Sequence, residues 1–224
     1  MFKRNISGSD LLLIIANLIP VFGVWFLGWS PTEAFIVYAM ETMIVGILTI
    51  LKMLIATIAK GKDEWHANGK TTLKSGFFFI FFFIIHFGIF AMVQTTIFSQ
   101  AAQITPPNSG MMHFFFKWYT YINEDIAWML GAFIISYIAK SFIPFLLNGD
   151  YKTMPIMAIM FQPYGRIFIQ QFTVILGSMF LSLGLGKIFI LVFALAKIAF
   201  ELLIDYDKLM GKAMNDLKKS SAKK

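Results

Sequence analysis

Apolar residues fall in blocks along this chain, rather than at the two-residue spacing of a strand or the 3.6-residue spacing of a soluble helix. Blocks of about twenty apolar residues match the ~30 Å hydrocarbon core of a bilayer at 1.5 Å rise per residue. The fold class predicted is all-α, a polytopic membrane helix bundle with short interfacial helices. About six transmembrane helices are expected, at Leu11 to Leu27, Thr32 to Ala59, Gly76 to Phe98, Ile126 to Leu147, Arg166 to Leu183 and Lys187 to Tyr206.

The segments between the blocks carry turn and capping signals. Pro106 to Gly110 predicts a turn, and the aromatic stretch His113 to Tyr121 predicts a short interfacial helix. The other expectations are a cap for the first helix at Ser9 or Asp10, a polar loop at Lys60 to Lys74, a cap at Asp125, an inner interfacial segment at Met154 to Phe161 and a turn at Pro163-Tyr164-Gly165. Residues 1–210 are expected to form one transmembrane domain, followed by a basic, disordered tail at 211–224.

Composition supports a membrane protein and argues against several chemistries. Only 14% of the 224 residues are charged, against about a quarter in soluble domains. The absence of cysteine excludes disulfides, thiolate metal sites and cysteine nucleophiles. No Gly-x-Ser-x-Gly elbow, His-Glu-x-x-His helix or glycine-rich phosphate loop occurs. We therefore expect no catalytic residue, no metal and no cofactor, and the sequence leans against an enzyme.

The net charge of +7 does not indicate nucleic-acid binding, because the lysines cluster at the ends of predicted spans and in the tail. The outer loops hold only Lys117 and Lys187, whereas the predicted inner segments hold most of the basic residues. By the positive-inside rule, both termini are expected in the cytoplasm. The predicted location is the inner membrane of a prokaryotic cell, and the lipid bilayer is the expected partner.

Several polar side chains lie deep within the predicted spans, where an ionisable group costs ~2.5–3.5 kcal/mol on insertion scales. Glu41 is expected to pair with Lys197 or with His86, and Glu201, one turn from Lys197, competes for that lysine. The hypothesis is one shared intramembrane polar centre, made of Asn17, Glu41, His86, Gln170, Gln171, Lys197 and Glu201. Two interpretations stay open: hydrogen bonds that hold the bundle together, or a site for a small polar solute, ion or proton.

A second hypothesis concerns Met160 to Ile169, where Pro163 and Gly165 precede the basic Arg166. Arg166 either snorkels at the start of a helix or, with Lys152 and Tyr164, contacts an anionic lipid headgroup or substrate. His86 is the only histidine inside a predicted span, so multi-histidine haem and zinc sites are not expected.

Four patches of the chain are distinctive: Asn17 to Pro20, Tyr38 to Glu41 with Gly46, Ile84 to Phe90, and Met160 to Gly177 (MFQPYGRIFIQQFTVILG). In these patches the chain resembles a family of small multi-pass prokaryotic membrane proteins, domain of unknown function 6498. The resemblance implies a multi-span membrane protein with an intramembrane glutamate and histidine, and it implies no activity. Members of that family often carry histidine at the positions of Tyr137 and Gln171, so a shared multi-histidine metal site would lack those ligands here.

Two functions compete on this reading. The first is a non-enzymatic subunit or partner of a membrane complex, either with other membrane subunits or as a homo-oligomer. The alternative is a small-solute, ion or proton transporter that uses the polar centre. A lipid- or quinone-handling enzyme built around Arg166 and His86 ranks below both.

Overall fold

The computed structural model describes residues 8–67 and 70–203, and only the backbone at positions 9, 66–67, 101, 166–175, 178 and 200–203. The predicted tail at 211–224 and the predicted domain end at 210 lie outside these residues. The described chain is all-α apart from one hairpin. Its elements are α1 (Gly8–Phe26), α2 (Pro31–Lys60), β1 (Lys62–Ala67), β2 (Lys70–Ser75), α3 (Gly76–Ala101), α4 (His113–Lys117), the 3-10 helix η1 (Trp118–Tyr121), α5 (Glu124–Tyr137), the π-helix η2 (Ile138–Phe142), α6 (Ile143–Leu147), α7 (Asp150–Thr153), α8 (Ile156–Ser182) and α9 (Gly186–Leu203).

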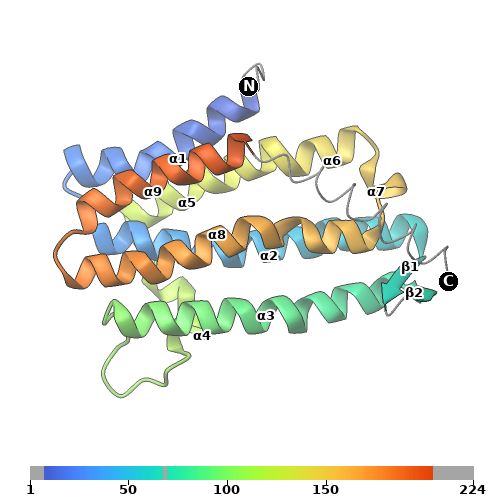
Figure 1. Cartoon of the computed structure of the whole chain (residues 1–224), viewed down its shortest axis with the longest axis horizontal. Coiled ribbons are helices and arrows are strands. Elements are labelled where there is room, and N and C mark those ends of the chain that lie inside the picture. Colours follow the sequence, from blue (N-terminus) through green and yellow to red (C-terminus); the bar gives the residue numbers. More distant parts are fainter. Residues whose placement is uncertain (1–7, 68–69, 204–224) are drawn as a thin grey trace.

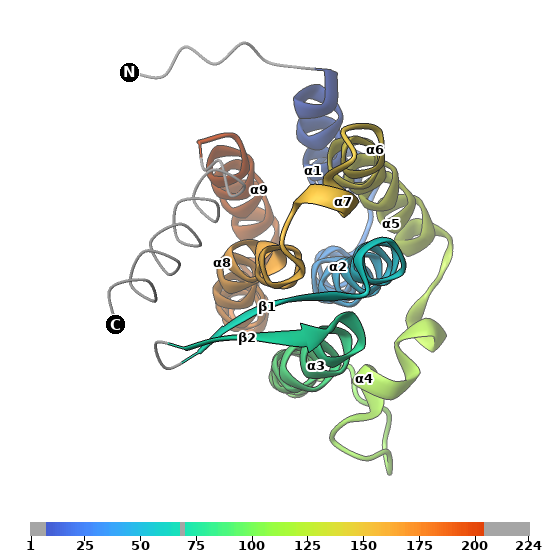
Figure 2. The same cartoon turned by 90° about the vertical axis from the view of Figure 1, so that its right-hand side faces the viewer.

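The long helices lie side by side along one direction (Figure 1). Helix α2 is central and packs against α3, α5, α8 and α9. In the end-on view of Figure 2, α1, α5 and α6 lie on one side of α2 and α8, and α3 lies on the other. Side chains on α2 can therefore contact several of the other long helices.

The connections gather at two ends of the bundle. The hairpin end consists of β1, β2, α6 and α7, on the right of Figure 1. The opposite end consists of the connections 27–30, 102–112 and 183–185. Two contacts tie that end together, from Asn123 Nδ2 to Glu33 Oε1 at 2.6 Å and from Trp25 Nε1 to the carbonyl of Lys187 at 3.3 Å.

Local sequence explains where α2 begins and ends. Ser30 caps the helix, accepting a hydrogen bond from the N–H of Thr32, and Glu33 bonds back to the N–H of Ser30 at 3.2 Å. Pro31 occupies the first helical position, where its missing N–H leaves no bond unmade. At the other end Gly61 has a φ of 75°, which favours glycine, and its N–H donates to Thr57. The predicted start of this helix is confirmed.

The segment predicted as a polar loop, Lys60 to Lys74, is instead an antiparallel hairpin in which Lys62 pairs with Ser75. Alternation in a short, charged strand is too weak to be read from hydropathy. The ring of Trp65 packs edge-on against Phe78 and Phe82, with centroids 5.2 Å away in each case. This contact fixes the hairpin against the start of α3.

The predicted boundaries of three helices are wrong. The segment Met154 to Phe161 is not separate, because α8 runs unbroken from Ile156 to Ser182. The turn predicted at Pro163-Tyr164-Gly165 and the span start predicted at Arg166 are therefore both wrong. A proline removes one backbone hydrogen bond from a helix, and packing against α2 and α3 retains the helical path here. Asn123, not Asp125, caps α5 through a 2.8 Å bond from the N–H of Ile126. Helix α1 already includes Ser9 and Asp10, so neither residue caps it.

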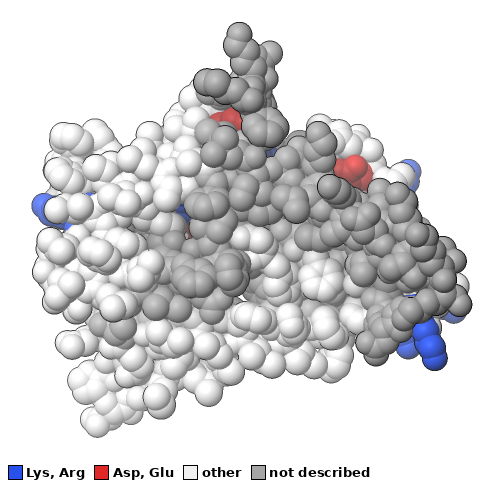
Figure 3. Space-filling view, in the orientation of Figure 1, with Lys and Arg blue, Asp and Glu red and all other residues white. Residues whose placement is uncertain are grey.

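Helices Pro31–Lys60, Gly76–Gln100 and Glu124–Leu147 are, within the described residues, long and apolar enough to cross a membrane, and Asp10–Phe26 is a shorter apolar helix. Two buried clusters fill the interior, one around Phe35, Tyr38 and Phe133, the other around Met53, Phe83 and Ile156. In Figure 3 the lysines that the view shows lie mainly at the two ends, and the described surface between them is largely uncharged.

Candidate functional site

A buried ion pair joins α2 to α9. The Nζ of Lys197 donates a hydrogen bond to Glu41 Oε2, and both side chains are only 3% exposed. Glu41 lies ten residues after the start of α2 and Lys197 lies eleven after the start of α9. Both helices start at the opposite end, so both charges lie about 15–17 Å along the bundle at 1.5 Å per residue. Of the two pairings predicted for Glu41, the structure contains the one with Lys197.

Aromatic rings enclose this pair. The ammonium of Lys197 lies 4.5 Å from the ring centroid of Phe133 and 5.3 Å from that of Tyr38. Tyr38 in turn packs edge-on against Phe193 at 4.8 Å and Phe133 at 6.0 Å. A cation over a desolvated aromatic face gains ~2 kcal/mol, so the rings offset part of the cost of burying the charge. The pair is closed off from solvent.

His86 bonds to a different residue from the Glu41–Lys197 pair. His86 on α3 shares a 2.7 Å hydrogen bond between its Nδ1 and the hydroxyl of Tyr164 on α8. Asn17 is 1% exposed, and its amide nitrogen donates to the carbonyl of Leu13 at 2.9 Å. Its Oδ1 has no hydrogen-bond partner among the described residues.

The remaining members of the predicted centre are placed only by their backbones. Gln170 and Gln171 lie in α8, Glu201 lies in α9, and the side chains of all three fall outside the described part of the structure. One shared centre therefore stays a prediction.

A second buried lysine, Lys52, does not belong to the polar centre predicted from the sequence. It is 1% exposed, and its Nζ donates to Ser141 Oγ at 2.6 Å. It also lies 5.3 Å from the ring centroid of Phe145 and 5.6 Å from that of Tyr137. Eleven residues separate it from Glu41, which is about three turns and ~16 Å on nearly the same face of α2. The signal was present, since a lysine inside an apolar block must find partners.

A further ion pair, between a buried aspartate and a partly exposed lysine, joins α1 to η2. The Nζ of Lys140 lies 3.2 Å from Asp10 Oδ1, and the side chain of Asp10 is 1% exposed. Lys140 and Ser141 are neighbours within η2, so one π-turn supplies the contacts of two helices. Single π-turns inside α-helices occur frequently at functional sites. Hydropathy does not reveal such a turn, so the π-helix was not predicted from the sequence.

Helices α2 and α3 share a buried polar contact as well. Thr42 Oγ1 donates to Gln94 Oε1 at 3.3 Å, and both residues are fully buried. Small hydroxyl and amide side chains hold helices together in lipid by such bonds. With the pairs above included, buried polar groups come from five parts of the bundle: α1, α2, α3, α9 and the continuous helix formed by α5 and η2.

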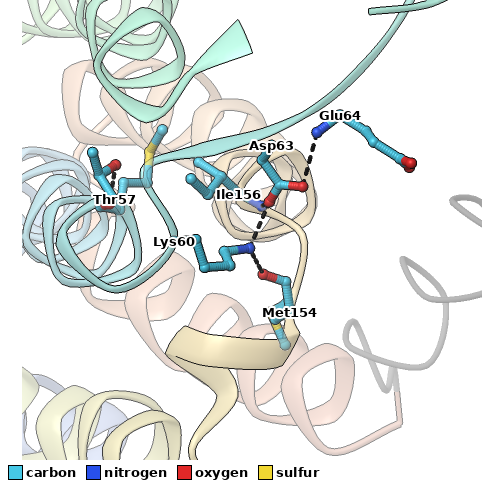
Figure 4. A network of polar contacts seen from close by, with 7 residues as sticks. Thr57, Lys60, Asp63, Glu64, Met154 and Ile156 are labelled. Atoms are coloured by element: carbon cyan, nitrogen blue, oxygen red, sulfur yellow. Dashed lines mark hydrogen bonds and ion pairs between the residues drawn. The ribbon is translucent and has the colours of Figure 1, made fainter. Parts of the chain in front are cut away.

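At the hairpin end, Asp63 connects three elements (Figure 4). Its Oδ2 accepts from Lys60 Nζ at 2.5 Å and from the N–H of Ile156 at 2.7 Å, while Oδ1 accepts from the N–H of Glu64 at 2.8 Å. Lys60 also donates to the carbonyl of Met154 at 2.6 Å. Burial alone would raise the pKa of Asp63, but the bonds from Lys60 and the two N–H groups, with the charge of Lys60, outweigh it and lower that pKa.

The predicted headgroup contact is only partly visible. Lys152 is exposed on α7, with its Nζ 5.4 Å from the ring centroid of Tyr151. The hydroxyl of Tyr164 is used by His86, and the side chain of Arg166 lies outside the described residues. Within the described residues, no group of three or more His, Cys, Asp or Glu side chains is placed to hold a metal ion.

Comparison with known proteins places the chain in a family. The model described as Family of unknown function (DUF6498) matches residues 2–222, and the chain belongs to this family. This confirms the resemblance noted in the four sequence patches. No curated protein and no solved structure matches the chain.

Proposed function

We propose that this protein is a six-span integral membrane protein of the prokaryotic inner membrane, with its hairpin end and both termini in the cytoplasm. Helices α1, α8 and α9 have 19, 27 and 18 residues, which at 1.5 Å per residue is about the hydrocarbon thickness or more. They would join the three candidate spans Pro31–Lys60, Gly76–Gln100 and Glu124–Leu147. The basic residues support this orientation. Lys60, Lys62, Lys70, Lys74 and Lys152 lie at the hairpin end, against Lys117 and Lys187 at the other.

Within the membrane, the proposed role is a non-catalytic partner subunit, in a complex with other membrane proteins or with a second copy. The observation that carries this role is the enclosure of the Glu41–Lys197 pair by Tyr38 and Phe133. Because the rings pack directly against the Glu41–Lys197 pair, no space is left beside it for a substrate. The two charges do fix which helices meet, because a helix in lipid that loses its partner exposes a charge.

Purification from native membranes in mild detergent, followed by native mass spectrometry, tests the role. The wild type is expected to retain a partner chain or a second copy in a fixed ratio. Glu41→Gln is expected to reduce that retention, whereas Glu124→Gln, a change at an exposed carboxylate in the first turn of α5, leaves it intact. A wild type that always leaves cross-linked native membranes as a lone monomer contradicts the role.

A proton or ion transporter is the second candidate, and a specific observation favours it. Ionisable groups lie in the interior at two levels of the bundle. Glu41 and Lys197 form one level, and Lys52 lies ~16 Å away along α2, bonded to Ser141, which is next to the Lys140 that pairs with Asp10 of α1. Proteoliposomes loaded with a pH-sensitive dye test it. Proton flux that Glu41→Gln abolishes without unfolding the protein supports transport, and a wild type with no flux of protons or small ions rejects it.

A further inference from the structure

The hydrogen-bonded pair His86 and Tyr164 is partly exposed and lies about a third of the way along α3 and α8 from the hairpin end. His86 lies ten residues from the start of α3 and Tyr164 eight from the start of α8, and both helices start at the hairpin end. The pair is therefore about 12–15 Å from that end, near the middle of a ~30 Å hydrocarbon layer. Both side chains are only partly buried. This placement rests on the proposed six-span arrangement.

The pair leaves hydrogen-bonding capacity unused. Among the described residues, the 2.7 Å bond between them is the one hydrogen bond that either side chain makes. A neutral imidazole and a phenol each carry one donor and at least one acceptor, so one of each remains. Depending on the tautomer, the pair presents either an N–H and a phenol oxygen or a ring nitrogen and an O–H. Exposed polar groups at this depth cost free energy unless a partner satisfies them.

Aromatic rings extend from the pair along one ridge of α3. Phe82 stacks on the ring of His86 at 5.5 Å and 12°, and Phe90 lies 5.2 Å from it on the other side. Phe90 is 41% exposed, and the ring of Tyr164 lies 6.3 Å away from it. Residues four apart share one helix face, so Phe82, His86 and Phe90 form a continuous surface. A flat ring can stack on such a surface.

We propose that His86 and Tyr164 bind the ring of a lipid-soluble quinone. At mid-membrane depth, a phospholipid offers only acyl chains, because its headgroup lies at the interface. A quinone brings a planar ring and isolated carbonyls into the hydrocarbon layer. Its carbonyl accepts a hydrogen bond from the imidazole N–H, and the other tautomer accepts the hydroxyl of the quinol. The site thus accommodates both forms, and binding alone is inferred.

Two measurements test this site. Lipids extracted from the natively purified protein are expected to contain quinone by mass spectrometry, in excess over the surrounding membrane. Alkyl-tailed benzoquinone and naphthoquinone are titrated against the detergent-solubilised protein, with binding followed by quenching of tryptophan fluorescence. The ring of Trp65 lies 5.2 Å from that of Phe82, so quenching is expected to respond to this site.

Variants decide the assignment. His86→Phe keeps a stacking ring and loses the hydrogen bond, so its Kd for the quinone is expected to rise about tenfold. Tyr164→Phe is expected to weaken binding in the same direction, and it decides the matter if the first variant fails to fold. The matched control is His113→Phe, because His113 shares a 3.0 Å bond with the hydroxyl of Tyr121 at the opposite end.

The control is expected to bind quinone like the wild type. Equal affinity of the wild type and a folded His86→Phe variant overturns the proposal. The proposal is also overturned if the wild type binds neither benzoquinone nor naphthoquinone. It is overturned as well if the natively purified protein carries phospholipid but no quinone. These outcomes are separate from the test of the partner role, which depends on Glu41 and on retained subunits.

Discussion

Removing one partner of the Glu41–Lys197 pair should destabilise the bundle by a measurable and predictable amount. Glu41→Gln keeps the size of the side chain but leaves the ammonium of Lys197, 3% exposed, without its carboxylate. Breaking a buried pair in this way costs ~3–5 kcal/mol. The rings of Phe133 and Tyr38 stay over the cation and retain ~1–2 kcal/mol of attraction. The expected loss in the free energy of unfolding is therefore about 1–4 kcal/mol.

The double variant separates the pair from its surroundings. Glu41→Gln with Lys197→Met leaves two neutral side chains of similar size, and replacing a buried pair by such residues is often close to neutral. We therefore expect the double variant to recover to within about 1 kcal/mol of the wild type, with a coupling of about 2 kcal/mol or more between the two sites. Unfolding in mixed micelles with increasing SDS, followed by circular dichroism, provides the free energies.

Two outcomes of this cycle would refute the reasoning. If either single substitution changes the free energy of unfolding by less than about 0.5 kcal/mol, the charges do not hold α2 to α9 as described. If the single effects simply add, the two residues do not act as a pair. The control Glu124→Gln alters an exposed carboxylate and should stay within about 0.5 kcal/mol of the wild type.

Three further predictions follow from single contacts. Because the pKa of Asp63 is lowered, its network is complete above the usual aspartate pKa and is lost as pH falls through the lowered folded value. The protection of the hairpin amides, taken as the intrinsic exchange rate at each pH divided by the observed rate, should therefore fall in acid, and Asp63→Asn should show the low protection already at pH 7. Gly177→Ala should destabilise the protein by about 1–3 kcal/mol, because the new Cβ would lie 2.0 Å from a buried phenylalanine ring, whereas Gly131→Ala, with open space around it, should be neutral or stabilising; equal melting temperatures would contradict this. Ser141→Ala should cost about 1.5–3 kcal/mol through its lost bond to the buried ammonium of Lys52, and an unchanged unfolding curve would show that the bond contributes little.

The sequence predicted the helices well, because apolar blocks and turn residues act locally. The start of α2 is one example: Thr32 was predicted, and the helix begins one residue earlier at Pro31, where Ser30 and Glu33 cap it locally. Pro163 misled the boundary of α8, because tertiary packing on α2 and α3 sustains a helix that the isolated segment would break. The hairpin was missed because its six-residue strands have too few apolar positions to show alternation.

The candidate site was predictable in kind and less so in detail. A glutamate and a lysine inside apolar blocks had to meet, and Glu41 with Lys197 does. Helix rotation decides the rest, and it depends on packing rather than on spacing. His86 therefore bonds Tyr164 instead, and the π-turn at η2 brings Lys140 and Ser141 to different partners.

The central claim, a bundle that crosses the membrane with its hairpin in the cytoplasm, is tested most directly by cysteine labelling. The chain has no cysteine, so a single one can be placed at Lys70 in the hairpin or at exposed Met111 at the opposite end. In intact cells, a membrane-impermeant maleimide should label Met111→Cys at once and Lys70→Cys only after the membrane is permeabilised. Equal labelling of both positions in intact cells, or recovery of the protein in the soluble fraction, would contradict the account.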